Sequence, residues 1–496
     1  MESQKLSAAR AYERANKELI PPIARPRFHL TPYLGWMNDP NGLSFYKGQY
    51  HMFYQYNPFG TVWDSMHWGH AVSSDLLQWT HLPVALAPDQ PYDSFGCFSG
   101  SAIETQDGKH LLLYTGVCKD TGDLGVDIQT QCVAVGNGLE YQKYALNPVI
   151  DEHLLPPGLN RSHFRDPKIW READGNLRCV VGSCNEQGLG RILLFSSSDG
   201  LSWRFEGILC ENTGRLGRMW ECPDFFTLGG KHVLLCSPMD MLPEGFEYHN
   251  GNGTVCMIGR YSEDQKRFYP ESDQAIDYGI DFYAPQTIET PDGRRVMIGW
   301  MQNWDTCALS RDETRPWFGQ MSLPRELSIY NGRLYQQPIR ELDLYKSGKI
   351  EHVNVRFQDE LRLDGVEGRM VDLELDIRPI EGENLYQKFT LLFAQDENYH
   401  TGLSYRTDES VLKIDRKFSG SRRAYIHQRR SLIPNRNGRI KLRVILDRYS
   451  AEVFVNDGEQ VLSATIMTDI SAKGISFFAE GIVEMDVRKY DLFSER

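Results

Sequence analysis

The first two thirds of the chain repeat a pattern in which a glycine-containing turn is followed by an apolar run. The five runs are "KGQYHMFYQYNP", "DGKHLLLYTG", "DGNLRCVVGS", "GGKHVLLCSP" and "DGRRVMIGW", with turn glycines at Gly48, Gly108, Gly175, Gly230 and Gly293. Another short run rich in β-forming residues precedes each glycine. Two such runs joined by a glycine turn predict an antiparallel hairpin.

A second recurring feature lies between these hairpins. An aromatic residue follows an Asp or Asn by four positions in the pairs Asp75 and Trp79, Asn137 and Tyr141, Asp199 and Trp203, and Asp264 and Phe268. Each pair is interpreted as the turn and outer strand of one unit. Four short strands repeated five times predict a five-bladed β-propeller, whose blades stack because none buries both faces of its sheet alone. Because the repeats are degenerate, a parallel β-helix or a large sandwich stays open as an alternative.

The pattern changes near residue 350, where apolar and polar residues alternate, as in "RMVDLELDIRPI" and "RIKLRVILDRYSAEVFVNDG". Such alternation indicates half-buried antiparallel strands, and five or more of them without helices predict a sandwich. At the other end, Leu6, Ala9, Tyr12, Ala15 and Leu19 recur at helical spacing. The sequence predicts an all-β protein with a short N-terminal helix, divided into a helical extension at 1–25, a propeller at 26–335, a linker at 336–349 and a β-sandwich at 350–496.

Counting back nine residues from each turn glycine gives Asp39, Ser99, Asp166, Glu221 and Ala284. If this strand is the innermost of each blade, equivalent positions converge at one mouth of the axial channel. Asp39, within "NDPNG", could be a turn former only. Three converging carboxylates repel one another, however, so a purely structural role is hard to justify.

Composition narrows the possible partners. The chain has 496 residues and a formal net charge of -13, which argues against a nucleic-acid partner. It has no run of about 18 apolar residues and no apolar core of a signal peptide near its start, so we expect a cytoplasmic protein without a membrane partner. The ten cysteines include no C-x-x-C pair, which favours reduced thiols over disulfides or a zinc site.

Converging acids suit either a metal ion or the cleavage of a glycosidic bond. No D-x-D-x-D-G loop occurs, and a strand or loop would not present His67 and His70 to one ion. The surroundings are instead rich in aromatic and amide side chains, which suit sugar faces and hydroxyls. These are Trp36, Asn38, Gln55, Tyr56, Asn57, Trp63, Trp68, Trp220, Tyr283, Trp300 and Trp304. The pattern predicts a carbohydrate substrate and glycoside hydrolysis without a metal or other cofactor.

Several motifs then resemble one known family. "WMNDPNG", "YQYNP", "HWGHAVSSDLLQW", "FSGSA", "FRDPK", "WECPDFF", "DFYAPQ" and "LPRELS" are similar to the ordered motifs of glycoside hydrolase family 32, the family of invertases, fructan hydrolases and sucrose-6-phosphate hydrolases. The match runs from about residue 27 to about 330, and "DRYSAEVFVNDGE" resembles the family's second domain. The family fold, a five-bladed propeller followed by a β-sandwich, agrees with the repeat count.

The resemblance implies roles for the three acids. Asp39 would be the nucleophile that attacks the anomeric carbon of the fructosyl unit. Glu221 would be the acid that protonates the leaving oxygen and then the base that activates water, and Asp166 would stabilise the transition state with Arg165 beside it. The family implies retention of configuration, for which nucleophile and acid should lie about 5 to 5.5 Å apart.

The resemblance also implies residues that line the fructose pocket. They are Asn38, Gln55, Trp63, Phe98 and Ser99. The alternative for Trp63 and Phe98 is core packing between blades. For Gln55, the alternative is a buried amide whose hydrogen bonds are satisfied within the protein. Cys222 follows Glu221 closely enough to perturb it, but we favour its interpretation as a packed small side chain.

We therefore expect a retaining β-fructofuranosidase that removes terminal fructose from sucrose, sucrose-6-phosphate or short fructo-oligosaccharides. A fructosyltransferase with the same site and a propeller that binds fructosides without cleaving them stay open as alternatives. The sandwich is expected to have a supporting role or to mediate assembly into a homo-oligomer, with sugar binding as the lesser alternative.

Overall fold

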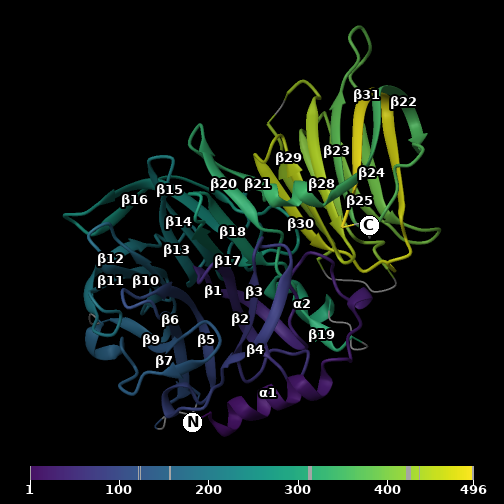
Figure 1. Ribbon diagram of the computed structural model, residues 1–496. Coiled ribbons are helices and arrows are strands. Elements are labelled where there is room, and N and C mark those ends of the chain that lie inside the picture. Colours follow the sequence, from purple (N-terminus) through teal and green to yellow (C-terminus); the bar gives the residue numbers. More distant parts are fainter. Residues whose placement is uncertain are drawn as a thin grey trace.

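The computed structural model describes residues 2–493 except 121, 123–124, 156–157, 311–314, 421–425 and 435. Figure 1 shows two bodies side by side, a ring of small sheets in the purple-to-teal part of the chain and larger strands in the green-to-yellow C-terminal part. The ring consists of five sheets around an axis, which confirms the predicted five-bladed propeller.

Each blade contains four antiparallel strands. The first three blades are β1–β4 (Gly35–Tyr46, Gln49–Asn57, His67–Ser73, Trp79–Leu86), β5–β8 (Gly96–Glu104, His110–Lys119, Asp127–Gly136, Tyr141–Lys143) and β9–β12 (Leu159–Arg171, Leu177–Asn185, Gly190–Ser197, Arg204–Glu211). The last two are β13–β16 (Trp220–Leu228, Lys231–Pro238, Val255–Ser262, Arg267–Ala275) and the strands β17, β18, β20 and β21 (Tyr283–Glu289, Arg295–Trp300, Arg325–Tyr330, Arg333–Pro338).

The five predicted hairpins join the first and second strand of each blade. Their turn glycines all have left-handed φ angles, between 74° and 89°, which a residue with a Cβ adopts only with strain. The first strands contact one another in the order β1, β5, β9, β13, β17 and back to β1, so they form the innermost ring. The short strand β19 (Trp317–Phe318) pairs parallel with β1 and ties the chain of the last blade to the first. The recurring aromatic residues lie at or beside the start of the outer strands β4, β8, β12 and β16.

The C-terminal strands form a sandwich-like sheet held together by one long ribbon. β22 (Lys346–Leu361) pairs along its length with β31 (Gly474–Leu492). One half of β31 pairs with β24 and the other with β23, so the ribbon spans both layers. One layer continues through β24–β27 (Lys388–Gln395, Thr401–Arg406, Val411–Asp415, Gln428–Leu432), and the other through β23 and β28–β30 (Val371–Arg378, Ile440–Asp447, Ser450–Val455, Gln460–Thr465). The predicted linker, 336–349, covers the end of β21, the 3₁₀ helix η4 (Arg340–Tyr345) and the start of β22; as a domain boundary it stays a prediction.

The predicted N-terminal helix is present as α1 (Gln4–Asn16), capped by the Ser3 hydroxyl. Leu6 and Ala9 are buried as expected, but the rest of the predicted apolar face is wrong. Tyr12, Ala15 and Leu19 are exposed, and Arg10 and Glu13 are buried in their place. Arg10 donates to the Val84 carbonyl and Glu13 accepts from the Val84 N–H, so polar contacts with β4 set the buried face.

The remaining helices are short. They are α2 (Trp304–Ser310), η1 (Pro22–Ala24), η2 (Pro91–Asp93) and η3 (Glu152–Leu154). In the described part of the chain, no helix is long and apolar enough to cross a membrane.

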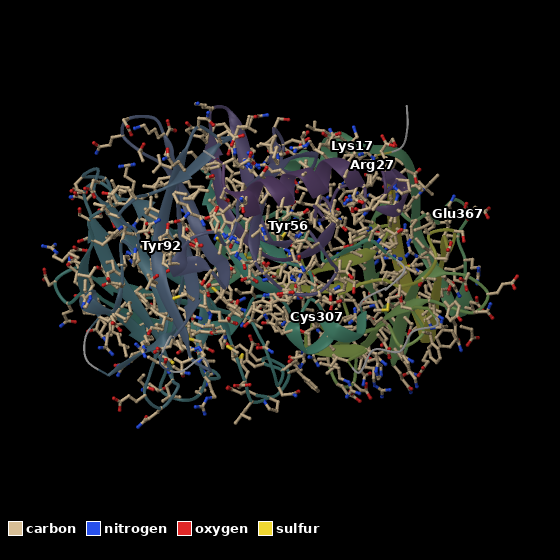
Figure 2. All side chains as sticks on the ribbon, turned by 90° about the horizontal axis from the view of Figure 1, so that it is seen from below. Lys17, Arg27, Tyr56, Tyr92, Cys307 and Glu367 are labelled. Carbon is tan, nitrogen blue, oxygen red and sulfur yellow. The ribbon has the colours of Figure 1, made fainter. Side chains whose placement is uncertain are left out.

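A buried ionic network joins the two bodies. The His29 ring lies between two carboxylates of the C-terminal body, with Nδ1 2.8 Å from Asp447 and Nε2 3.0 Å from Glu452. Arg325 of the propeller also pairs with Glu452, at 2.6 Å, and with Asp277, at 3.0 Å. Figure 2 shows this end of the N-terminal segment from below, where Arg27 is labelled beside the C-terminal strands. The network fixes the propeller against the C-terminal sheets.

Candidate active site

The predicted acids lie on three innermost strands, because Asp39 belongs to β1, Asp166 to β9 and Glu221 to β13. Each innermost strand carries a bulge near these positions, a feature that re-aims side chains and is common beside active sites. In β1, Asn38 and Asp39 lie opposite Gln55, and in β5 the bulged residue is Ser99. The bulges of the other three strands are Asp166 and Pro167 in β9, Cys222 and Pro223 in β13, and Ala284 and Pro285 in β17; they lie opposite Val181, Cys236 and Gly299, respectively.

The prediction that all five positions share one register is wrong for Glu221. Glu221 lies just before the bulge of its strand, and Cys222 takes the place that Asp166 has in β9. Cys222 and Asp166 both have left-handed φ angles, 48° and 67°. Counting back nine residues from the turn glycine does not give equivalent positions in these two blades, because β13 and β14 are joined by two residues, whereas β9 and β10 are joined by five. Hydrogen bonds between blades nevertheless bring the acids together.

Asp39 is held by neighbours on both carboxylate oxygens. The Ser99 hydroxyl donates to Oδ2 at 2.6 Å, and the Asn38 amide donates to Oδ1 at 3.1 Å. Asn38 is itself oriented by the indole of Trp36, which donates to its Oδ1 at 2.7 Å. Desolvation raises the pKa of Asp39, and the nearby charge of Glu221 adds to this rise. Asp39 is partly exposed, so a substrate can reach its carboxylate.

Glu221 is fixed by an arginine and a tyrosine. Arg165 donates to its Oε1 from Nη2 at 3.0 Å and from Nε at 3.2 Å, and the Tyr283 hydroxyl donates to its Oε2 at 2.6 Å. Burial and the Glu221 charge raise the pKa of Tyr283, so the phenol stays neutral and able to donate. Arg165 lies closer to Glu221 than to Asp166, whose carboxylate is 3.9 Å away.

Asp166 is the most enclosed of the three acids, with 6% of its surface exposed. Its Oδ2 accepts the backbone N–H of Cys222 at 2.9 Å, and its own N–H donates to the Thr115 hydroxyl at 3.0 Å. Burial raises the pKa of Asp166; the Arg165 charge opposes the rise, and the charges of Glu221 and Asp39 add to it.

Cys222 lies between two of the acids, a role that the sequence did not reveal. Its Sγ is 3.6 Å from Asp39 Oδ2 and 3.7 Å from Asp166 Oδ2. Burial and the charge of Asp166 raise the pKa of Cys222 well above its usual range. The residue therefore stays a thiol whose S–H can donate to a carboxylate, and its interpretation as a packed small side chain is incomplete.

The predicted pocket residues fall into three groups. Asn38 and Ser99 contact Asp39. Gln55 is buried and its amide donates to the Cys97 carbonyl at 2.9 Å, which agrees with the alternative of a buried amide bonded within the protein. Trp63 is 38% exposed and packs edge-on against Phe98, with ring centroids 5.7 Å apart. These two rings form an accessible aromatic edge.

Ser99, Asp166 and Cys222 border a small cavity of about 10 Å³, together with Lys168 and Gln286, which follow the bulges of β9 and β17. That volume suits a single water molecule.

The described residues include no group of three or more His, Cys, Asp or Glu side chains arranged to hold a metal ion. All ten cysteines are free thiols. The arrangement suits acid, base and nucleophilic chemistry by carboxylates on a sugar.

Comparisons with known proteins agree on one family. The model described as "Glycosyl hydrolases family 32 N-terminal domain" matches residues 29–338, and the model for the C-terminal domain of that family matches 341–492. A sucrose-6-phosphate hydrolase of Zymomonas mobilis is 37% identical over 97% of this chain and 94% of its own length. A raffinose invertase of Escherichia coli is 35% identical over 92% of both chains.

Solved structures show the same architecture. A Bombyx mori β-fructofuranosidase mutant in complex with sucrose superposes with a TM-score of 0.84, is 32% identical and covers 99% of both chains. A sucrose-6-phosphate hydrolase from Lactobacillus gasseri superposes with a TM-score of 0.82 at 26% identity, covering 99% of this chain and 96% of the other.

Proposed function

Because the chain belongs to glycoside hydrolase family 32, we propose that it is a retaining β-fructofuranosidase acting on sucrose or sucrose-6-phosphate. The observation that carries this proposal is the convergence of Asp39, Asp166 and Glu221, which Cys222 and Arg165 link, with a different set of donors on each acid. Different environments for neighbouring carboxylates are how one site assigns them different tasks.

In the first step, Asp39 attacks the anomeric carbon of the fructosyl unit while Glu221 gives a proton to the leaving oxygen. The C–O bond to the leaving sugar breaks, and a covalent fructosyl ester forms on Asp39. Asn38 and Ser99 hold the two oxygens of Asp39, so the nucleophile is oriented before the substrate arrives.

The transition state carries positive charge on the fructose ring. Asp166 cannot swing away, because its Oδ2 is bound to the Cys222 N–H and its N–H to Thr115. A fixed carboxylate stabilises this charge more than it stabilises the neutral substrate. We assign Asp166 to this role, together with hydrogen bonds to fructose hydroxyls.

In the second step, Glu221 takes a proton from water, which attacks the anomeric carbon. The bond between that carbon and the Asp39 oxygen breaks, so fructose leaves with retained configuration and Asp39 returns to a carboxylate. Arg165 and Tyr283 both donate to Glu221, so they stabilise the carboxylate that remains after the first proton transfer. The same two donors hold Glu221 in one position through both steps.

We propose that the site removes one terminal fructose per event. The test is a comparison of kcat/KM and first products on sucrose, sucrose-6-phosphate, 1-kestose and inulin. We expect free fructose as the first product from each and a kcat/KM that falls as the chain lengthens. Release of internal oligosaccharides from inulin would rule out the exo mode, and transfer products at low sucrose concentration would favour a fructosyltransferase. A cytoplasmic location and assembly through the C-terminal sheets stay predictions.

A further inference from the structure

The innermost strands open into a second cavity at their opposite ends, near the hairpin turns. This cavity has a volume of about 700 Å³, within the range of small-molecule sites. All five blades contribute to it, through residues that follow the bulges, including Lys168, Asp224 and Thr287. None of the predicted catalytic or pocket residues lines it, so it is separate from the catalytic mouth.

The charged side chains of this cavity are sorted by depth. The cations lie inside, with side-chain exposures of 11% for Lys168, 15% for Arg295 and 17% for Arg178. Five acids also line the cavity: Asp224 is buried, whereas Glu104 is exposed and Glu172, Glu263 and Glu289 have side-chain exposures of 36%, 56% and 68%. Among the described residues inside, Asp224 is therefore the one acid beside three cations. Because solvent screens exposed charges more than buried ones, the interior is electrostatically positive.

The floor contains more cations than acids. The Lys168 ammonium is 3.1 Å from Asp224 and donates to the Thr287 carbonyl at 2.5 Å. Arg295 stacks on the Phe226 ring at 4.7 Å, and its carboxylate partner is the exposed Glu289. Burial lowers the pKa of both cations, and their mutual repulsion lowers that of Lys168 further. Two buried cations thus share one buried acid.

Arg171 supplies a further cation at the edge of this cavity. Its guanidinium donates to the carbonyls of Gly175 and Glu104, and no carboxylate of the described residues pairs with it. Arginine held by carbonyl groups keeps its charge and free N–H groups, which suit a phosphate or a carboxylate.

Aromatic rings form the wall beside these cations. Phe225 packs with Trp170 at 6.0 Å, with Tyr261 at 5.7 Å and with His232 at 5.7 Å. We propose that the cavity binds a small organic anion, a phosphate ester or a carboxylate, whose charge faces Lys168, Arg295 and Arg171 and whose body packs on this wall. A metal cation would be repelled by the same groups, and a neutral sugar would leave the charge uncompensated.

The proposal is tested by isothermal titration of the full chain with glucose 6-phosphate, citrate, inorganic phosphate and glucose. We expect at least one of the two organic anions to bind once per chain, more tightly than inorganic phosphate, and glucose not to bind in this way. Arg171→Gln and Arg295→Gln should each weaken the binding tenfold or more. The matched control Arg260→Gln, which removes an exposed arginine paired with Glu271, should not change it. Sucrose hydrolysis should be unchanged in all three variants.

Three results would overturn the proposal. One is the absence of binding by both organic anions at millimolar concentration, and another is an affinity unaffected by Arg171→Gln. The third is competition by saturating fructose, which would place the anion in the catalytic mouth instead. The substitution at Arg171 keeps the test decisive if Arg295→Gln fails to fold, because Arg171 lies at a strand end and contacts only carbonyl groups. None of these results depends on the proposed hydrolase activity.

Discussion

Two groups of acids in the molecule are compensated in opposite ways, the pair Asp447 and Glu452 and the pair Asp39 and Asp166. At the junction of the two bodies, Asp447 is fully buried, yet hydrogen bonds and charge from His29 and two backbone N–H groups outweigh the desolvation and lower its pKa. The pKa of Glu452 is lowered in the same way, by Arg325 and His29. At the candidate active site, desolvation raises the pKa of Asp39 and Asp166, and the neighbouring acid Glu221 adds to the rise.

Asp447 and Glu452 hold the two bodies together, whereas Asp39 and Asp166 are the acids to which we assign chemistry. A compensated buried acid stabilises the native state only while its partner is present, because removing the partner leaves an unpaired charge. Acids that repel one another cost stability, and active sites are where such a cost is retained. Neutralising a pocket acid should therefore spare or raise stability, whereas removing a junction cation should lower it.

The largest effect is expected from Asp39→Asn. The amide cannot attack the anomeric carbon, so kcat should fall by about 10⁴-fold or more. The midpoint of thermal unfolding should stay the same or rise, because the substitution removes one of three neighbouring negative charges. Sucrose hydrolysis and a melting curve check both parts, with Asp107→Asn in an exposed turn as the control. Activity like that of the wild type from pure Asp39→Asn protein would end the assignment of the nucleophile.

Glu221→Gln should have the next largest effect, a loss of roughly 10² to 10⁴-fold in kcat on sucrose. The amide keeps the shape but cannot protonate the leaving oxygen. A substrate whose leaving group needs no proton, such as fructosyl fluoride, should be much less affected in its first step, and a burst measurement would show this. Equal losses on sucrose and on the fluoride would contradict the role of general acid.

His29→Ala tests the other side of the comparison. It leaves Asp447 and Glu452 without a shared cation, and the free energy of unfolding should fall by about 3 to 5 kcal/mol. His153→Ala, at an exposed histidine, should change it by less than about 0.5 kcal/mol. Urea unfolding measures both, and kcat under folding conditions should be unchanged in each. An equal, small effect of the two substitutions would mean that the junction network does not hold the bodies together.

The same histidine predicts how stability depends on pH. His29 has its pKa raised to about 9: burial opposes protonation, but hydrogen bonds and charge from Asp447 and Glu452 outweigh it. Its contribution is therefore fully present below the unfolded value near 6.5 and is lost as the pH rises through about 9. Stability measured from pH 6.5 to 10 should decline in the wild type and decline less in His29→Ala. Parallel curves would remove His29 as the cause.

A smaller effect is expected from Cys222→Ala. It removes a thiol placed between Asp39 and Asp166, and a lost hydrogen bond to a charged group is worth about 1.5 to 3 kcal/mol. We expect a fall in kcat of roughly tenfold and a shift in the acid limb of the pH profile. An unchanged pH profile would reduce Cys222 to a packing residue.

The sequence revealed the parts of the fold that repeat. Glycine turns recur because only glycine adopts the left-handed angle without strain, and the hairpins followed from them. Asp39 and Asp166 were found by their distance from those turns. Glu221 lies one residue before the position equivalent to Asp166. The same count still found it, because the shorter turn after β13 moves the counted position back by one residue as well.

Contacts made across blades could not be predicted in this way. The bond from Tyr283 to Glu221 and the position of Cys222 depend on bulges. A proline lies in or beside four of the five bulges and marks their positions, but it does not show which side chain each bulge turns toward its neighbours. The buried face of α1 was misjudged because Arg10 and Glu13 form hydrogen bonds with Val84, a tertiary contact that outweighs apolar periodicity.

The most direct test of the account is to trap the covalent intermediate. The Glu221→Gln variant is mixed with β-fructofuranosyl fluoride, so that the ester forms without the general acid and its hydrolysis is slow without the base. Rapid denaturation, proteolysis and mass spectrometry then locate the label. We predict one anhydrofructose unit per chain on the peptide that contains Asp39, and none when Asp39→Asn is added. A label on Asp166, or turnover with no labelled peptide at any time, would contradict the assignment of Asp39 as the nucleophile.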